Sequence, residues 1–166
     1  MSSIADHRAR KDEFFLRSPQ SPIDDPGSFT GLSYYDEVSA LSFRVPMTPG
    51  DGAEVTVQTS DGRERIYHRA GTIALEIEGE QVDLTLYRTP HNDGYFVPFR
   101  DATSGNETYG AGRFLDLEEA VDGIVAIDFN LAYNPYCAYS EGYSCPLPPP
   151  ENWLPVPVRA GERGYA

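Results

Sequence analysis

Lysine is almost absent from this sequence. Lys11 is the only lysine, and every other basic residue is an arginine. Asp and Glu together number 26 against 13 Lys and Arg, so the formal net charge is −13. A nucleic-acid-binding protein needs a basic patch to neutralise phosphates, and no cluster of Lys and Arg forms one here. Nucleic acid is therefore excluded as an expected partner.

Long apolar runs are also missing. A membrane-spanning helix needs roughly 20 consecutive apolar residues, and no segment approaches that length. The N-terminal segment up to Ser18 is charged and holds no apolar run of signal-peptide length. We therefore expect a soluble, cytoplasmic protein with no membrane partner.

Common catalytic motifs are missing as well. The sequence has no G-x-G-x-x-G, no G-K-[ST], no H-E-x-x-H and no G-x-S-x-G. Nucleotide, zincin and serine-hydrolase chemistries are therefore unsupported, and no cofactor is indicated. The sequence leaves open whether the chain is an enzyme and what its oligomeric state is.

Only two cysteines are present, too few for a disulfide scaffold in a chain of 166 residues. Cys137 and Cys145 are either reduced thiols packed as small hydrophobes, a loop-closing disulfide, or half of a metal site. Their spacing matches no compact zinc pattern, and two further ligands would have to come from His68, His91, Asp128 or Glu141. A cysteine nucleophile is least favoured, because no histidine partner is evident. In a reducing cytoplasm we expect packed thiols.

The N-terminal residues 3–17 have the apolar spacing of a helix, with apolar residues set among charges at Ile4, Phe14, Phe15 and Leu16. Pro19 and Pro22 end this helix, and residues 18–37 are predicted to form an extended connector. The weak apolar content predicts a helix that lies as a cap on the main body.

Period-two alternation begins near residue 38 and predicts strands. Ile73, Leu75 and Ile77, for example, alternate with polar or small residues, and glycine-containing turns separate such runs. The expected fold is all-β, a small antiparallel barrel or curved sandwich over residues 38–130, within a single domain covering 1–166. The many prolines beyond this core predict an irregular C-terminal wrap over residues 131–166.

Residues 124–129 are apolar on both faces, which predicts a central strand. Asp128 and Asn130 continue one of these faces with a carboxylate and an amide. Such an aspartate either accepts hydrogen bonds from backbone donors of the tail or acts as an acid or base with a raised pKa.

Unusual polar side chains gather in the glycine-broken loop over residues 100–113. The candidate ligand-binding residues are Arg100, Asp101, Glu107, Tyr109 and Arg113 in this loop, with Asp128, Asn130 and Asn134 beyond it. The candidate catalytic residues are Asp101, Glu107, Tyr109 and Asp128. The alternative is a surface hairpin laced with ion pairs. If the loop is a site, its arginines and carboxylates lie close together, with at least one contact between the two kinds.

Tyrosines recur just after this region. Tyr133, Tyr136, Tyr139 and Tyr143 either line an aromatic pocket or cover the core with an apolar ring and a wet hydroxyl.

The block FRDATSGNETYGAGRFLD and the tail from NPYCAY to AGER resemble a family of bacterial and archaeal proteins, the domain of unknown function DUF1684. The resemblance includes the N-terminal helix and the S-P connector, so it covers nearly the whole chain. Asn106 departs from the family pattern, in which we expect a lysine, and this removes one cation from the loop. The resemblance implies a shared architecture, and no established activity comes with it.

Two functions from different classes remain. A binding module would hold a small ligand, for instance an anion, in the barrel mouth, with Arg100 and Arg113 as paired donors and tyrosines as walls. An enzyme would use Asp101, Glu107 or Asp128 as acid or base, with Tyr109 and both arginines assisting. A structural metal site at the two cysteines is a further alternative. Binding is preferred, because no nucleophile–base pair can be read from the sequence.

The acidic, lysine-poor composition predicts a halophilic protein. At about 1 M salt the Debye length is roughly 3 Å, which removes most of the repulsion among surplus carboxylates. We expect the melting temperature to be higher in molar KCl than in dilute buffer, as measured by thermal scans at both salt levels. A flat or falling trend would instead favour a mesophile whose GC-rich codons replace lysine by arginine.

Overall fold

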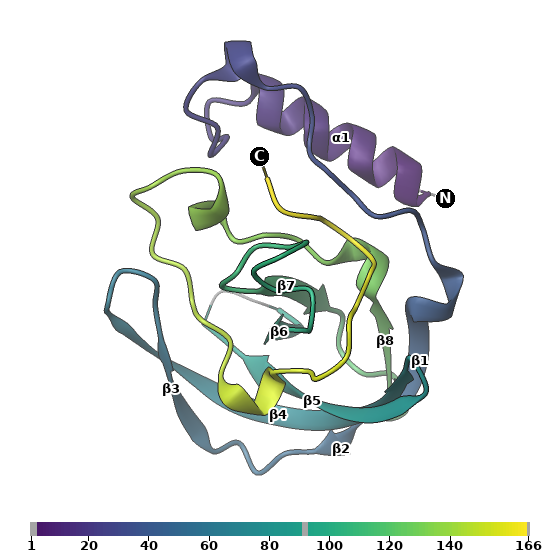
Figure 1. Ribbon diagram of the computed structural model, residues 1–166. Coiled ribbons are helices and arrows are strands. Elements are labelled where there is room, and N and C mark those ends of the chain that lie inside the picture. The colour runs from purple at the N-terminus through teal and green to yellow at the C-terminus, as the bar shows by residue number, and fades with distance from the viewer. Residues whose placement is uncertain (1–2, 91–92, 166) are drawn as a thin grey trace.

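The computed structural model describes residues 3–90 and 93–165 and contains two antiparallel sheets (Figure 1). The larger sheet has the order β2-β4-β5-β6-β7, with β3 also paired to β4, and the smaller sheet pairs β1 with β8. The strands are β1 (Ser42–Pro46), β2 (Thr48–Pro49), β3 (Glu54–Gln58), β4 (Glu64–Ile77), β5 (Glu80–Arg88), β6 (Tyr95–Phe99), β7 (Arg113–Leu117) and β8 (Ile124–Asp128).

The prediction of an all-β fold with one N-terminal helix is confirmed. The barrel form of this prediction is corrected, because the strands of the described residues form two separate sheets that do not close into a barrel. A curved sandwich is the closer description: Figure 1 shows β4 and β5 bending beneath β6 and β7. A barrel mouth is therefore not available as a binding site.

The β4–β5 hairpin is the longest element of the larger sheet. Its register runs from His68↔Arg88 to Ile77↔Glu80, with a register shift between Arg69 and Gly71. The turn needs left-handed backbone at Glu78 (φ 53°) and Gly79 (φ 77°), which glycine adopts at no steric cost.

The larger sheet buries side chains on both faces. Aliphatic residues such as Leu84 and Val97 point into the main core, which the smaller sheet and the C-terminal tail also line. On the opposite face, aromatic residues form a second core with Cys145: Tyr67, Tyr87, Phe96 and Phe114. Because neighbouring residues of a strand point to opposite faces, the same strands supply both cores.

The strand over residues 124–129 is not central, which corrects the prediction from its apolar composition. β8 pairs only with β1, and its inward face carries the buried Val125 and Ile127. Ala126, on the other face, is exposed. Phe129 lies in the core within the short 3-10 helix η3 (Phe129–Leu131), where the strand has already ended.

The C-terminal tail is irregular but firmly bonded to the sheet. Asn152 is fully buried in the 3-10 helix η5 (Pro150–Asn152). Its side-chain amide donates to the carbonyls of Thr85 and Pro98, both at 2.9 Å, and its oxygen accepts from the Thr85 amide at 2.8 Å. β5 and β6 pair at only one position, Tyr87↔Phe96, so Asn152 supplies hydrogen bonds that the sheet lacks there.

Helix α1 (Ile4–Arg17) lies against one end of the body and begins with a capping box formed by Ser3 and Asp6 (Figure 1). Phe15 is its only buried residue, as the weak apolar pattern indicates. The helix is also held by an ion pair between Lys11 and the buried Glu162 of the tail. Among the described residues, no helix is long and apolar enough to cross a membrane.

We expect Lys11→Met to destabilise the protein. Glu162 is 2% exposed, so losing its cation leaves a buried carboxylate without a charge partner, at a cost of about 1–3 kcal/mol. The matched control is Arg17→Met, because Arg17 pairs with Glu13 on the exposed side of the same helix. That change is expected to stay within about 0.5 kcal/mol. Equal losses of unfolding free energy for the two variants, measured by urea unfolding, would contradict the view that Lys11 holds α1 against the tail.

Candidate functional site

The predicted loop cluster contains a buried ion pair. Arg113 at the start of β7 lies 3.4 Å from the Asp101 carboxylate, and the two side chains are 1% and 0% exposed. This is the contact between an arginine and a carboxylate that the sequence led us to expect. A pair so deeply buried is stable only where further hydrogen bonds satisfy both groups.

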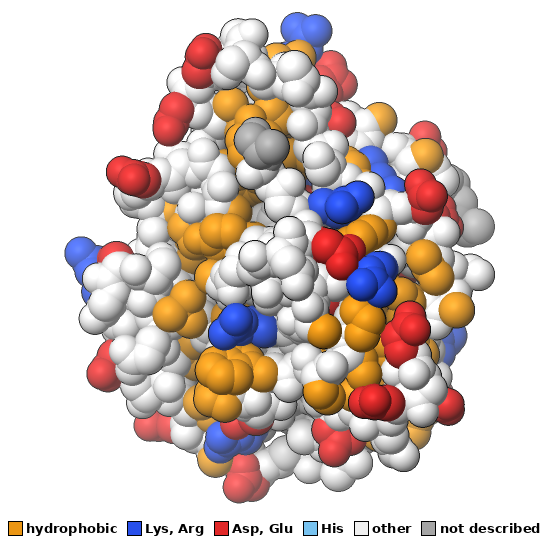
Figure 2. All heavy atoms as spheres, viewed as in Figure 1, with side chains coloured by type: hydrophobic (Ala, Val, Ile, Leu, Met, Phe, Trp, Pro, Cys, Tyr) orange, Lys and Arg blue, Asp and Glu red, His pale blue; other side chains and the backbone are white. Residues whose placement is uncertain are grey.

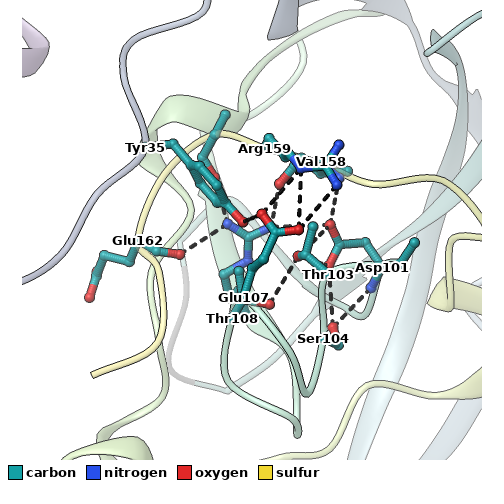
Figure 3. Close-up of polar contacts among 12 residues, drawn as sticks. Tyr35, Asp101, Thr103, Ser104, Glu107, Thr108, Val158, Arg159 and Glu162 are labelled. Atoms are coloured by element: carbon teal, nitrogen blue, oxygen red, sulfur yellow. Dashed lines mark hydrogen bonds and ion pairs between the residues drawn. The ribbon is translucent and has the colours of Figure 1, made fainter. Parts of the chain in front are cut away.

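The C-terminal tail supplies those hydrogen bonds (Figure 3). The Arg113 guanidinium donates to the backbone carbonyls of Val158 at 2.8 Å and Glu162 at 3.1 Å, and also to that of Ala160. Asp101 accepts from the Val158 amide at 2.6 Å and from the Thr103 hydroxyl. Burial lowers the pKa of Arg113, and the nearby Asp101 charge opposes that shift. The contacts of Arg113 and Asp101 fasten the tail.

Glu107 belongs to the outer side of the same cluster. Its carboxylate accepts hydrogen bonds from Arg159 at 3.1 Å and from the Tyr35 hydroxyl at 2.9 Å (Figure 3). The bonds from Arg159 and then Tyr35 hold the pKa of Glu107 below its usual value. Glu107 is therefore an ionised carboxylate near neutral pH.

Arg100 has a different environment. Its guanidinium lies 5.0 Å from the ring centroid of Trp153, whose indole nitrogen donates to the Pro148 carbonyl. Arg100 and Arg113 thus contact different partners.

Asp128, Asn130 and Asn134 take part in backbone connections. Asp128 accepts from the Asn130 amide at 2.9 Å and so caps η3. The Asn130 side chain exchanges two hydrogen bonds with the backbone of Val38, and Asn134 donates to the Arg163 carbonyl at 3.0 Å. Asp128 therefore has a structural contact, but its donor is Asn130, two residues further along, and not the tail that the sequence led us to expect.

A cavity of about 440 Å³ lies between the aromatic face of the larger sheet and the tail. Such a volume falls in the range of small-molecule sites. Tyr133, Tyr136 and Tyr143 line it, while Tyr139 turns away and donates to Glu162. The full lining is Arg65, Tyr67, Thr89, Phe96, Phe114, Asp116, Tyr133, Asn134, Pro135, Tyr136, Tyr143, Ser144, Cys145 and Pro146.

Two charged residues belong to the cavity lining. Arg65 donates to the Ser144 carbonyl at 2.5 Å, and Asp116 accepts from the Tyr133 hydroxyl at 2.6 Å. Burial first, and then Asp116, raises the pKa of Tyr133, which stays an uncharged donor at neutral pH. A second cavity of about 400 Å³ shares Asp116, Tyr133 and Tyr136 with the first. Its other wall is formed mainly by α1, including Lys11.

Cys137 and Cys145 are both free thiols. Cys145 is buried in the aromatic core, and Cys137, in the 3-10 helix η4 (Tyr136–Ala138), packs against that core. Tyr109 donates to the Cys137 sulfur at 3.5 Å. Within the described part of the chain, which leaves out His91, no three His, Cys, Asp or Glu side chains gather as metal ligands would.

Sequence reasoning missed the sheet side of the cavity. Tyr67, Phe96 and Phe114 lie on β4, β6 and β7, on the face opposite the aliphatic core. An aromatic residue on the supposedly exposed face of a strand is the signal that could have located them, since it indicates a covered second face.

The β-rich fold, the capping helix and the fastened tail define the class of protein, and comparison with known proteins agrees. The family model described as "Protein of unknown function (DUF1684)" matches residues 27–163, so the chain belongs to this family. A similar solved structure is the solution NMR structure of an uncharacterized protein from gene locus rrnAC0354 of Haloarcula marismortui. It shares 40% identity at a TM-score of 0.74, covering 96% of this chain and 91% of that one. A comparison with curated proteins finds no match.

We expect Asp101→Asn to lower the free energy of unfolding by about 3–5 kcal/mol, because it leaves the buried Arg113 charge unpaired. The matched control is Glu107→Gln, which removes a partly exposed carboxylate of the same loop and should cost much less. Urea unfolding of the three proteins measures this. Comparable losses of unfolding free energy for the two variants would show that burial does not set the contribution of the Arg113–Asp101 pair to stability.

Proposed function

We propose that this protein is a binding module for a small molecule with a planar apolar body, held in the cavity between the larger sheet and the tail. The observation that carries the proposal is the lining itself. Six aromatic residues line this open pocket of about 440 Å³, namely Tyr67, Phe96, Phe114, Tyr133, Tyr136 and Tyr143. Aromatic walls with a few polar groups are typical of small-molecule sites.

The polar groups of the lining indicate how a ligand would be oriented. Asn134 is 1% exposed, and its side-chain oxygen is buried without a hydrogen-bond partner in the described structure. A buried acceptor left unpaired costs about 1–3 kcal/mol, which a donor on the ligand would offset. Tyr133 adds a neutral hydroxyl at the boundary with the second cavity.

An anionic group on the ligand fits best beside Arg65, the cationic residue of the lining. Asp116 lies in the same lining and accepts from Tyr133, so the carboxylate already has a donor. We therefore propose Arg65 as the residue that binds an anionic group, in place of the predicted pair Arg100 and Arg113. In a salt-rich cytoplasm, the expected setting, stacking on the rings would supply most of the affinity because salt screens the charge.

The acid–base alternative draws no specific support from these contacts. Asp101 is bonded to Arg113 and the tail, Glu107 to Arg159 and Tyr35, and Asp128 to η3. Each of these carboxylates has partners that account for its position.

The proposal is tested with three matched probes: benzoate, benzyl alcohol and benzylamine, titrated against ¹⁵N-labelled protein by NMR. We expect shifts at residues of the cavity and the affinity order benzoate, benzyl alcohol, benzylamine. Tyr136→Ala should weaken benzoate about tenfold by removing one aromatic wall. Arg65→Gln should remove the preference for benzoate over benzyl alcohol and leave benzyl alcohol binding unchanged.

Trp153→Ala is the control, because Trp153 is an exposed aromatic residue outside the cavity. It should leave all three titrations unchanged. Shifts scattered over the surface, or equal losses for Trp153→Ala and Tyr136→Ala, would refute a site in this cavity.

A further inference from the structure

Both cysteines belong to the aromatic core, where Cys145 is a buried member and Cys137 packs against it. Cys137 belongs to η4, and the chain then turns back so that Cys145 enters the core against Tyr67, Phe96 and Phe114. Ser60, in the turn between β3 and β4, fixes the second position: its hydroxyl accepts from the Cys145 amide at 3.1 Å, and its own amide donates to the Cys145 carbonyl at 2.8 Å. The Cys145 backbone is thereby tied to the sheet.

The environments of the two sulfur atoms are unequal. Cys137 is half-buried, whereas Cys145 is 7% exposed. The Tyr109 hydroxyl donates to the Cys137 sulfur at 3.5 Å, and the Cys145 thiol interacts with the same sulfur. Hydrogen bonds to a thiolate stabilise it, so Cys137 is the sulfur prepared to carry charge.

The acidities follow from this arrangement. The Cys145 thiol lowers the pKa of Cys137, burial opposes that shift, and the Tyr109 hydroxyl adds to it, while Cys137 and burial raise the pKa of Cys145. Burial raises the pKa of Tyr109, which therefore remains a donor at neutral pH. Arg65 and Tyr67 also lie near the pair, both beside Cys145, and Tyr87 and Tyr133 belong to the same cluster.

We propose that Cys137 and Cys145 form a redox site in which Cys137 reacts with a hydroperoxide and Cys145 then closes a disulfide. The proposal goes beyond ligand binding in the cavity and does not depend on it. The sequence argued against a cysteine nucleophile because no histidine partner was evident; Tyr109 and Cys145 take that place in the structure.

The chemistry balances as a two-electron oxidation of the protein. The Cys137 thiolate attacks one peroxide oxygen, an S–O bond forms, the O–O bond breaks, and the departing alkoxide takes a proton from water to leave as an alcohol. The Cys145 sulfur then attacks the Cys137 sulfenic acid. The S–S bond forms, the S–O bond breaks, and the hydroxide leaves as water with the Cys145 proton. An external dithiol restores both thiols.

The disulfide would join the two ends of the segment over residues 137–145, which includes Tyr143 of the cavity wall. Cys145 also lines the cavity, and Cys137 follows directly after the cavity residue Tyr136. Oxidation would therefore tie together two parts of one wall.

The test treats native protein with one equivalent of hydrogen peroxide and counts thiols before and after. Because the chain has two cysteines, the expected result is complete loss of free thiol with a mass change of two hydrogens, reversed by dithiothreitol. Cys145→Ser should stop at a sulfenic acid on Cys137, trapped as a dimedone adduct. Cys137→Ser should leave Cys145 unmodified.

The Tyr109→Phe variant distinguishes a reactive Cys137 from a cysteine that only packs in the core. Removing one donor should raise the pH midpoint of Cys137 alkylation by iodoacetamide by about 0.5–1 unit. The matched control, Tyr34→Phe, removes a hydroxyl that contacts Asp12 and should leave the midpoint unchanged. Should a variant fail to fold, peptide mapping of partly alkylated wild-type protein still reports which cysteine reacts first.

Three results would each overturn the proposal. They are thiols that react with peroxide only after unfolding, Cys145 reacting before Cys137, and zinc bound to the purified protein and released by replacing both cysteines. The last result would assign the pair to a metal site instead.

Discussion

The buried contact between Arg113 and Asp101 is the constraint on which the rest of the structure depends. Arg113 gathers three carbonyls of the tail, and Asp101 holds the Val158 amide. A proline-rich segment has few amides to offer a sheet, so it needs side-chain partners to stay in place. The paired charges of Arg113 and Asp101 provide such partners without a regular strand. Asn152 does the same for an earlier part of the tail through its side-chain hydrogen bonds.

The tail residues held by Arg113 and Asp101 cover the aliphatic face of the larger sheet, whereas residues 133–146 of the tail cover its aromatic face. The covering is incomplete, and the cavity lies where the two surfaces separate. The same segment brings Cys137 and Cys145 to the aromatic core and Tyr109 to Cys137. The proposed ligand site and the proposed redox site are therefore both products of tail docking. The face seen in Figure 2 carries acidic side chains around its edge, and its Lys and Arg side chains are scattered and form no basic patch.

Much of the fold follows from local patterns. The strands β4 and β5 and the helix α1 appear where alternation, helical spacing and capping residues predict them. β8 was misjudged as central, because an apolar run in sequence cannot tell a strand covered on both faces from one with a small exposed residue such as Ala126. The loop over residues 100–113 was recognised as unusual for a sound reason, its mixed charges. The side chains of Arg113 and Asp101 nevertheless form hydrogen bonds with the tail backbone.

The sequence by itself determined the acidic surface, the positions of several strands and the irregular character of the tail, because composition, alternation and proline act locally. Only the tertiary structure decided which polar residues are buried and what they contact. The Val158 amide reaches Asp101 across 57 positions of the chain, and Lys11 reaches Glu162 across 151. Pairings at such separations depend on how the whole tail packs. Burial makes an unpaired charge more costly, and no local sequence pattern specifies which residue becomes its partner.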